Sequence, residues 1–386
     1  METERALSPH LQWGWSIGAM ALAGLVLAGL HGGNWRMPVL FMLGAALGAV
    51  LFLSSFGFAS AYRALLVHRD PAGVKAQLLM LALASMLFAP VLAQGSVFGQ
   101  AVSGAYAPVS TQVVVGAFVF GIGMQLAGGC GSGALFAAGG GSTRMLIVLA
   151  CFIAGSFWAS LHMNWWERLP SRGEIVLGDA LGWNEALTLQ LGVLGAIWLG
   201  LGRMSTARIA APVAPETMSA MQSRTLMIGA FLLALLAFMV LLVAGHPWSI
   251  TWAFTLAGAK LARWAGWRPD DSSFWNGDFQ RRALDGPLLD DVTAVMDIGL
   301  LLGAAAAAGA AGRFRLSAPP SGPSLVAAVI GGIAMGYGAR IAYGCNIGAF
   351  FSGVASTSLH GWVWIVAALG GSAIGVRLRP RFGLSG

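Results

Sequence analysis

Charged residues are scarce in this chain. Asp, Glu, Lys and Arg make up 10% of its 386 residues, whereas soluble domains carry about 25%. So few charges cannot cover the surface of a soluble protein of this length. The composition therefore excludes an ordinary soluble globular domain.

Nucleotide- and metal-binding motifs are also missing. The sequence contains no Walker loop, dinucleotide fingerprint, zinc-ligand pattern or hydrolase nucleophile motif. We therefore expect no cofactor, no metal and no ATP-driven step within this chain. The net charge of +7 indicates basic loops against anionic lipid and argues against a nucleic-acid partner.

Cysteine is rare as well. Only Cys130, Cys151 and Cys345 occur, and no two of them form a CxxC pair. We therefore expect neither a disulfide framework nor a cysteine-based metal site.

Long apolar runs fill most of the chain. Hydrophobic residues make up 57% of it, and the mean hydropathy is +0.75. The runs are about as long as membrane-spanning helices, and backbone groups in hydrocarbon must be satisfied within the chain. We predict an all-α, multi-pass protein of the lipid bilayer, without a cleavable signal peptide because the first run lacks a basic start. Examples are Leu11–Leu30, Gln77–Ala93, Thr225–Val243, Val292–Ala311 and Leu325–Ile341.

Two glycine-rich stretches resemble each other. Gly121–Ala134 contains Cys130, Gly336–Ala349 contains Cys345, and seven of the 14 aligned positions are identical. The same offset of 215 residues aligns apolar runs over most of the chain. We predict an N-terminal repeat (1–163), a connecting segment with one extra span (164–223) and a C-terminal repeat (224–386).

The repeats are expected to be inverted across the membrane, as in many transporters. Loop charges leave the orientation open. The basic loop with Arg63, Arg69 and Lys75 and the basic loop 203–224 both favour the cytoplasm, and the inverted arrangement is expected to place them on opposite sides.

The paired cysteines are the strongest candidates for a site. A lone buried cysteine is usually a small apolar filler, but this thiol recurs at equivalent positions within flexible backbone. A helix beginning near each cysteine would direct its positive end at an anion, and a thiol suits a soft, sulfur-containing ligand. Cys151 aligns with Val366 and is expected to be a filler. The predicted substrate-binding set is Cys130, Cys345, Arg340, Gly129, Gly131, Ser132, Gly344 and Asn346.

Arg340 lies in an apolar run, five residues before Cys345. Ionisable residues at such depth usually face a polar interior, so Arg340 is a candidate for attracting an anion. Two alternatives stay open, namely that its side chain reaches an interface or that it pairs with an aspartate such as Asp297. The polar stretch Arg263–Asp291 is expected to form a surface loop with ion pairs, with Trp264, Trp267 and Trp275 at the membrane interface.

The two glycine–cysteine motifs, together with the run Asp291–Gly303, resemble the YeeE/YedE family of sulfur-transport membrane proteins. The resemblance implies about nine spans with short re-entrant helices, in the bacterial inner (plasma) membrane. It implies uptake of thiosulfate or a related sulfur anion, passed between cysteines by S–H···S contacts without a stable covalent intermediate. It also implies a soluble sulfur-carrier partner of the TusA type.

This chain departs from the family pattern at one point. Family members often carry a cysteine in an early Gly-Phe-Cys motif, and the equivalent here is Gly57-Phe58-Ala59. The departure reduces the expected relay to two thiols and leaves a selenium species open as an alternative substrate.

Three classes of function are compatible with the residues. The first is a transporter of a small sulfur-containing anion. The second is a membrane sulfurtransferase or thiol redox enzyme that uses a cysteine persulfide or disulfide, although no His or Lys lies within a helical turn of either cysteine to activate it. The third is a purely structural packing protein, which does not explain why the thiol repeats.

Overall fold

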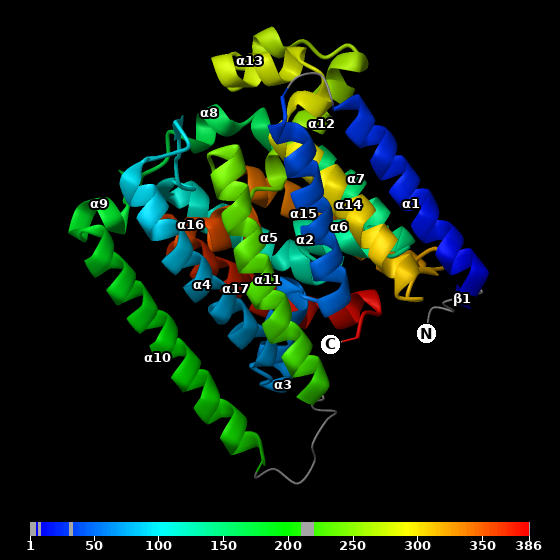
Figure 1. The fold of residues 1–386 in the computed structure, drawn as a ribbon, viewed down its shortest axis with the longest axis horizontal. Coiled ribbons are helices and arrows are strands. Elements are labelled where there is room, and N and C mark those ends of the chain that lie inside the picture. Colours follow the sequence, from blue (N-terminus) through cyan, green and yellow to red (C-terminus); the bar gives the residue numbers. More distant parts are fainter. Residues whose placement is uncertain (1–4, 7–8, 31–33, 210–219, 386) are drawn as a thin grey trace.

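The fold is a bundle of helices in which several elements begin or end inside the bundle (Figure 1). The computed structural model describes residues 5–6, 9–30, 34–209 and 220–385. Within these residues, nine helical stretches are long and apolar enough to cross a membrane. The prediction of an all-α, multi-pass membrane fold is therefore confirmed.

The first half of the chain supplies ten helices. They are α1 (Pro9–Gly29), α2 (Arg36–Ser54), α3 (Phe58–His68), α4 (Ala72–Gln94), α5 (Thr111–Ala127), α6 (Gly131–Gly139), α7 (Thr143–Ser160), α8 (Met163–Trp166), α9 (Leu177–Leu181) and α10 (Trp183–Ile209).

The second half supplies α-helices together with shorter 3-10 and π-helical turns. They are α11 (Ala220–Ala244), α12 (Thr251–Trp264), η1 (Pro269–Asp271), α13 (Asp278–Asp285), η2 (Leu288–Asp290), α14 (Val292–Ala310), α15 (Gly322–Ile341), the π-helical turn η3 (Asn346–Phe351), α16 (Ser352–Ala355), α17 (Leu359–Leu378) and η4 (Arg379–Phe382).

Strands are short and confined to connections between helices. Three antiparallel pairs occur in the described residues, of which β2 with β3 is a hairpin within one connection and the other two join segments far apart in the sequence. They are β1 (Arg5–Ala6) with β6 (Arg315–Leu316), β2 (Ser96–Val97) with β3 (Gln100–Ala101), and β4 (Pro108–Ser110) with β5 (Ser171–Glu174).

Glycines allow the central helices to approach backbone to backbone. A side chain on Gly48 of α2 would overlap the carbonyl of Leu300 on α14, and one on Gly303 would overlap the carbonyl of Ala45. Such close packing replaces the hydrophobic driving force that helices lack in lipid. The glycine content of the sequence therefore serves helix contacts as well as the expected helix breaks.

The helices pack in reciprocal pairs across the two halves of the chain. α5 packs against α15 and α17. α15 packs in turn against α5 and α7. Likewise α2 packs on α14, α11 on α4, α3 on α17 and α12 on α7. This reciprocity supports a repeat in which α2 corresponds to α11 and α3 to α12, whereas the offset of 215 aligns α1 with α11. The repeat and its residue boundaries stay a prediction.

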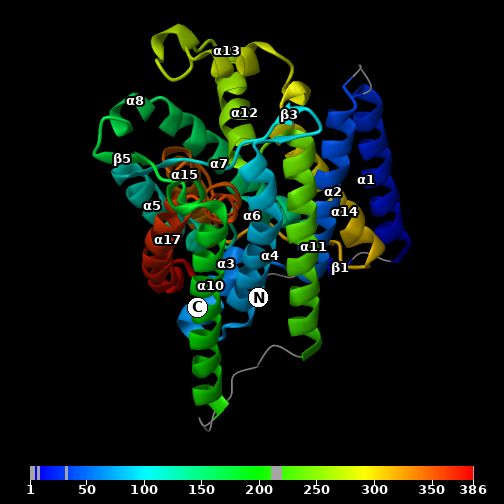
Figure 2. The same cartoon turned by 60° about the vertical axis from the view of Figure 1, so that its left-hand side comes forward.

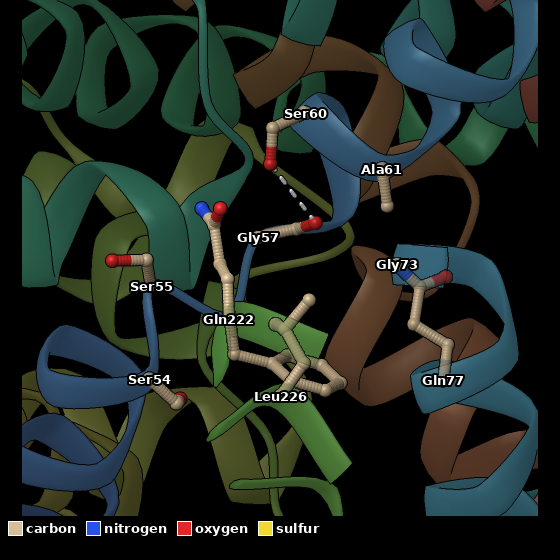
Figure 3. A pocket seen from close by; sticks show the side chains of 10 residues that line it. Ser54, Ser55, Gly57, Ser60, Ala61, Gly73, Gln77, Gln222 and Leu226 are labelled. Atoms are coloured by element: carbon tan, nitrogen blue, oxygen red, sulfur yellow. Dashed lines mark hydrogen bonds between the residues drawn. The ribbon is translucent and has the colours of Figure 1, made fainter. Parts of the chain in front are cut away.

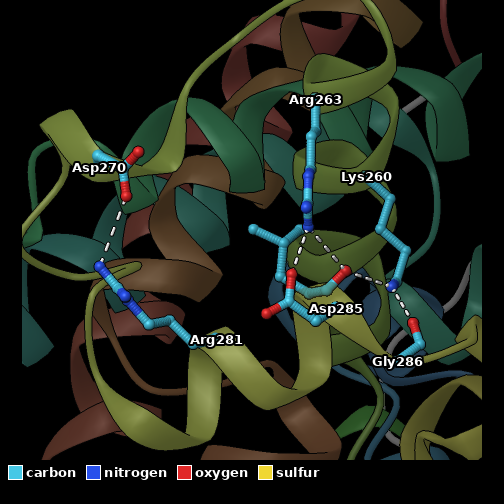
Figure 4. A network of polar contacts seen from close by, with 7 residues as sticks. Lys260, Arg263, Asp270, Arg281, Asp285 and Gly286 are labelled. Carbon is cyan, nitrogen blue, oxygen red and sulfur yellow. Dashed lines mark hydrogen bonds and ion pairs between the residues drawn. The ribbon is translucent and has the colours of Figure 1, made fainter.

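The polar stretch before α14 is folded and carries ion pairs, as expected. Two ion pairs can be followed in Figure 4. Arg263 Nη1 lies 2.6 Å from Asp285 Oδ1, and Arg281 Nη2 lies 3.5 Å from Asp270 Oδ1. The expectation for Trp275 was wrong. Trp264 is exposed, but Trp275 is buried and donates from Nε1 to Ser160 Oγ at 2.9 Å, because it anchors the loop on α7.

The glycine contacts generate a stability prediction. Gly48→Leu should lower thermal stability in detergent, because overpacking typically costs about 1–3 kcal/mol and here the obstacle is backbone. Gly192→Leu on α10 is the matched control, since nothing lies within 4 Å of a side chain there. Equal melting temperatures for the two variants would contradict the packing described.

Candidate functional site

Cys130 and Cys345 each stand immediately before a helix that begins inside the bundle. Cys130 is the N-cap of α6, with φ −91° and ψ −169°. Cys345 is the N-cap of η3, with φ −102° and ψ −164°. Neither thiol makes a capping hydrogen bond. The expectation that a helix starts at each cysteine therefore agrees with the structure, and both start from the same backbone conformation.

The turns before the two cysteines contain glycines in conformations that L side chains rarely adopt. Gly128 ends α5 with φ +85°, a conformation that L side chains rarely adopt. Gly344 has φ +153°, and a Cβ there would lie 2.7 Å from the amide nitrogen of Ala349. The flanking glycines therefore allow the chain to reverse directly into each half-helix.

The thiol of Cys345 lies beside Gly131, the residue that follows Cys130. A Cβ built on Gly131, the residue after Cys130, would stand 3.6 Å from Cys345 Sγ. A Cβ on Gly133 would stand 3.6 Å from Cys130 Sγ. Cys130 and Cys345 are 1% and 0% exposed. Gly131 and Gly133 thus place no side chain of their own beside these sulfur atoms, in a site closed to solvent.

Polar partners accompany each thiol. Ser132 is buried, and its Oγ lies 3.4 Å from Cys130 Sγ. Asn346 is also buried. Tyr62 donates its hydroxyl to Asn346 Oδ1 at 3.3 Å, and Asn346 Nδ2 donates to Met124 Sδ at 3.5 Å. Since a thioether sulfur is a weak acceptor, the Asn346 amide can turn to an anion at little cost.

Two further half-helices reach the same region. α3 approaches η3 through Tyr62 and Phe58. The Phe58 ring packs edge-on against the Phe350 ring, with 6.4 Å between the ring centroids. α12 approaches α6 on the other side, where Ile250 Cγ2 and Phe254 Cε2 lie 3.5 and 3.8 Å from the Cβ position of Gly131. The N-terminal ends of α3, α6, α12 and η3 therefore converge, and helix N-termini carry partial positive charge.

Sequence reasoning missed Tyr62, Ile250 and Phe254. One signal was available for Tyr62, because it stands four residues after Phe58 of the early motif and so shares a helix face with it. Ala59 occupies the early-motif position, and its carbonyl accepts a hydrogen bond from Gln125 Nε2 at 3.0 Å. No thiol lies at that position.

Arg340 lies away from the thiols. Its guanidinium stands over the ring of Phe274, 5.1 Å from the centroid, and its Nε has no hydrogen-bond partner. The described residues give it no bond to either cysteine. Its nearby charge partners are Glu167 and Tyr343, at the end of the bundle that carries α8.

The alternative that Arg340 pairs with Asp297 is wrong, because both carboxylate oxygens of Asp297 are without a partner. Cys151 lies on α7, where its Cβ packs against Gly332 of α15. This packing agrees with a filler role.

The amino-acid sequence is similar to those of known membrane transport proteins. A family model for sulphur transport matches residues 53–374, a range that contains both cysteines. The chain is 28% identical to the "Thiosulfate transporter TsuA" of Spirochaeta thermophila over 343 residues, which cover 83% of this chain and 92% of that protein.

Shorter matches join the chain to two enterobacterial proteins. It is 37% and 36% identical over 135 residues to proteins named "Probable transporter YedE" from Escherichia coli and Salmonella typhimurium. The match spans about a third of each of these relatives, 33% in both cases. Because the family model covers most of the chain, the protein belongs to the sulphur transport family of membrane proteins.

Proposed function

We propose that the protein takes up thiosulfate or a closely related sulfur anion, which passes between Cys130 and Cys345 without forming a covalent bond to either. The observation that carries the proposal is the pair of thiols at the start of two converging half-helices, with Cys345 Sγ beside the bare backbone of Gly131, the residue after Cys130. A soft sulfur ligand can contact one thiol and then the other across this gap.

The surroundings suit an anion with one soft end and several oxygens. Converging helix N-termini attract negative charge. The thiols offer weak S–H donors to the terminal sulfur, while Ser132 and Asn346 offer donors to oxygens. Gly129, Gly131 and Gly344 expose backbone rather than side chains. A selenium analogue would meet the same groups, so the chemistry does not separate these two substrates.

Passage through the site requires opening, because both cysteines are buried. Arg340 suits the first attraction of the anion at the α8 end, where the residue keeps partial exposure. With alanine at position 59, we propose a relay of two thiols. A soluble sulfur carrier of the TusA type would then receive the anion at the opposite end.

Sulfurtransferase chemistry is the second candidate, and the closeness of the two thiols favours it. A persulfide or disulfide route needs a thiolate, which a neighbouring base or cation normally stabilises. The polar groups in contact with the pair are Ser132, Asn346 and Tyr62, and none of these is basic. The transporter is therefore the better-supported reading.

The orientation can be proposed from a pocket of about 260 Å³ (Figure 3). It is lined by Ser55 and Gly57 between α2 and α3, by Gln77 of α4 and by Gln222 of α11. The loop between α3 and α4 and the start of α11 therefore lie at one end of the bundle. Lys75 Nζ lies 5.6 Å from the ring centroid of Trp198 on α10. This contact also places the loop between α3 and α4 near the end of α10.

We propose that the two basic loops lie on the same side of the membrane, in place of the opposite sides expected from an inverted repeat. Four spans separate them, α4, α5 with α6, α7 and α10, and an even number of crossings returns the chain to the same side. Arg313 joins this end by donating to the carbonyl of Leu53 at 3.3 Å.

The same end gathers ten of the chain's 22 Lys and Arg residues. Arg144 Nη2 donates to the carbonyl of Leu126 at 2.7 Å, and Arg379 Nη1 donates to that of Gln125 at 2.6 Å. By the positive-inside rule we assign this end to the cytoplasm of a bacterial inner membrane, and the α8 and α13 end to the outside. Basic residues at the proposed inner end are Arg63, Arg69, Lys75, Arg144, Arg224, Arg313, Arg315, Arg377, Arg379 and Arg381.

The thiol relay makes a direct prediction about uptake. Cys130→Ser and Cys345→Ser should each abolish uptake of labelled thiosulfate into proteoliposomes, because a hydroxyl is a hard, poorly polarizable replacement for the soft thiol. Cys151→Ser is the matched control and should transport normally, since Cys151 packs away from the pair.

Normal uptake by both single variants and by the double variant would reject the relay. Mass spectrometry of the wild-type protein after turnover should find no added sulfur on Cys130 or Cys345. A persulfide on either residue at high yield would support the sulfurtransferase instead.

The proposed orientation can be checked with new cysteines in a Cys151→Ser background. Ser273→Cys on the exposed outer loop should react with a membrane-impermeant thiol reagent on intact spheroplasts. Ser385→Cys, next to Arg379, should react only after the membrane is opened. The reverse labelling pattern would invert the topology.

A further inference from the structure

Asp297 is a buried acid that the thiol site does not use. It lies on α14, within the run Asp291–Gly303, and is 5% exposed. Both of its carboxylate oxygens are buried without a hydrogen-bond partner. Ionisable side chains inside a membrane are costly and usually functional, so a carboxyl in this position needs a role.

The carboxyl borders a cavity of about 330 Å³ with apolar walls. The walls include Leu22 of α1, Leu135 of α6, Phe254 of α12 and Leu301 of α14, and among the described residues that line it Asp297 alone is ionisable. An ionised carboxylate in such surroundings has no compensating partner, and proteins usually avoid this cost by neutralising the group.

The surroundings favour a proton over a metal ion as the neutralising cation. Hard cations need several oxygen ligands, and the other residues lining the cavity are all apolar. The described residues hold no group of three or more His, Cys, Asp or Glu side chains that could bind a metal. A proton needs only the carboxyl itself.

The Asp297 cavity and the thiol site share two structural elements. Phe254 lines the cavity and also lies 3.8 Å from the Cβ position of Gly131 beside Cys345. Leu135 lines it from α6, one helical turn after Gly131. Asp297 is close enough to Cys345 for their charges to interact. A change of charge at Asp297 therefore acts on the helices that carry the thiols.

A second acid lies at the start of α14, near the outer surface. Asp291 caps α14, accepting from Ala294 N at 2.9 Å and from Trp252 Nε1 at 2.7 Å. Burial raises the pKa of Asp291 above its ordinary value, although these hydrogen bonds act in the opposite direction. Asp291 and the exposed Asp290 line a separate pocket near the surface, so a proton can reach the start of α14.

Few other charged groups stand near Asp297. From the described parts of the elements packed on α14 they are Asp290 of η2, Lys260 and Arg263 of α12, and Arg36 of α2. Lys260 donates to the carbonyls of Leu284 and Gly286, and the guanidinium of Arg36 stands 5.9 Å from the ring centroid of Trp35. The described parts of α1 and α6 that line the cavity add no charge.

We propose that Asp297 carries a proton that moves together with the anion, which makes the protein a proton–anion symporter. The inference rests on the proposed function, because it supplies the coupling ion for the same thiol site. A proton on Asp297 offsets one of the two negative charges of thiosulfate, whose entry into a negatively charged cell interior is otherwise uphill. Its release afterwards restores the carboxylate for the next cycle.

The test uses the full-length protein in proteoliposomes with labelled thiosulfate. An acidic outside should stimulate uptake by the wild type, and Asp297→Asn should lose this stimulation while still exchanging labelled for unlabelled thiosulfate at equal pH. Asp285→Asn is the matched control, because Asp285 is an exposed acid paired with Arg263, and it should keep the full stimulation. Infrared spectra of the wild type should show a protonated buried carboxyl that Asp297→Asn lacks.

The outcomes separate the two proposals. No thiosulfate uptake by the wild type under any gradient would reject the proposed function, and the infrared band would still decide whether Asp297 binds a proton. Wild-type uptake that ignores the pH gradient, or stimulation that survives in Asp297→Asn, would overturn the symport proposal. The symport proposal would also be overturned if Asp297→Asn lost both exchange and gradient-driven uptake. In that case the residue would only maintain the structure.

Discussion

The interruption of helices inside the bundle is the constraint on which the rest of the structure depends. A helix that begins at membrane depth leaves its first backbone N–H groups without helical partners, and lipid offers none. Such an interruption is tolerated only where protein surrounds it or where it faces a ligand. At Cys130 and Cys345 the turns are enclosed by α3, α12 and the two half-helices, and the thiols occupy the cap positions. An anion is the natural partner for donors arranged in this way.

The other features of the fold serve this arrangement. Close glycine contacts between α2 and α14 bring α14 against α6, and α6 carries the first thiol. The Tyr62–Asn346 hydrogen bond joins α3 to the second half-helix. The main neighbours of α6 are α2, α7 and α14, whereas those of η3 are α16 and α17. Alternating access requires a difference of this kind between the two sides of a site.

Much of this could be predicted from the sequence, because the signals are local. Apolar runs predicted the spans, clustered glycines predicted breaks, and the repeated glycine–cysteine motif indicated the two cap positions. Contacts between distant residues could not be predicted. Tyr62 and Asn346 are 284 residues apart, and the helices that carry them are apolar on most faces, so no pattern indicates which face turns inward. The proposed Arg340–Asp297 ion pair was wrong for the same reason. Two opposite charges in apolar runs suggest an ion pair, but the sequence does not show which way each side chain points. Trp275 was assigned to an interface although it anchors the outer loop on α7.

The central claim is that one small anion contacts both thiols in turn through its soft atom. The most direct measurement is a structure determined with selenosulfate, in which anomalous scattering locates the selenium that replaces the terminal sulfur of thiosulfate. The account predicts a selenium peak beside Gly131, in non-bonded contact with the sulfur of Cys130 or Cys345, with the oxygens directed at Ser132, Asn346 or the half-helix N-termini. A peak elsewhere in the protein, or one at covalent distance from a cysteine sulfur, would contradict it.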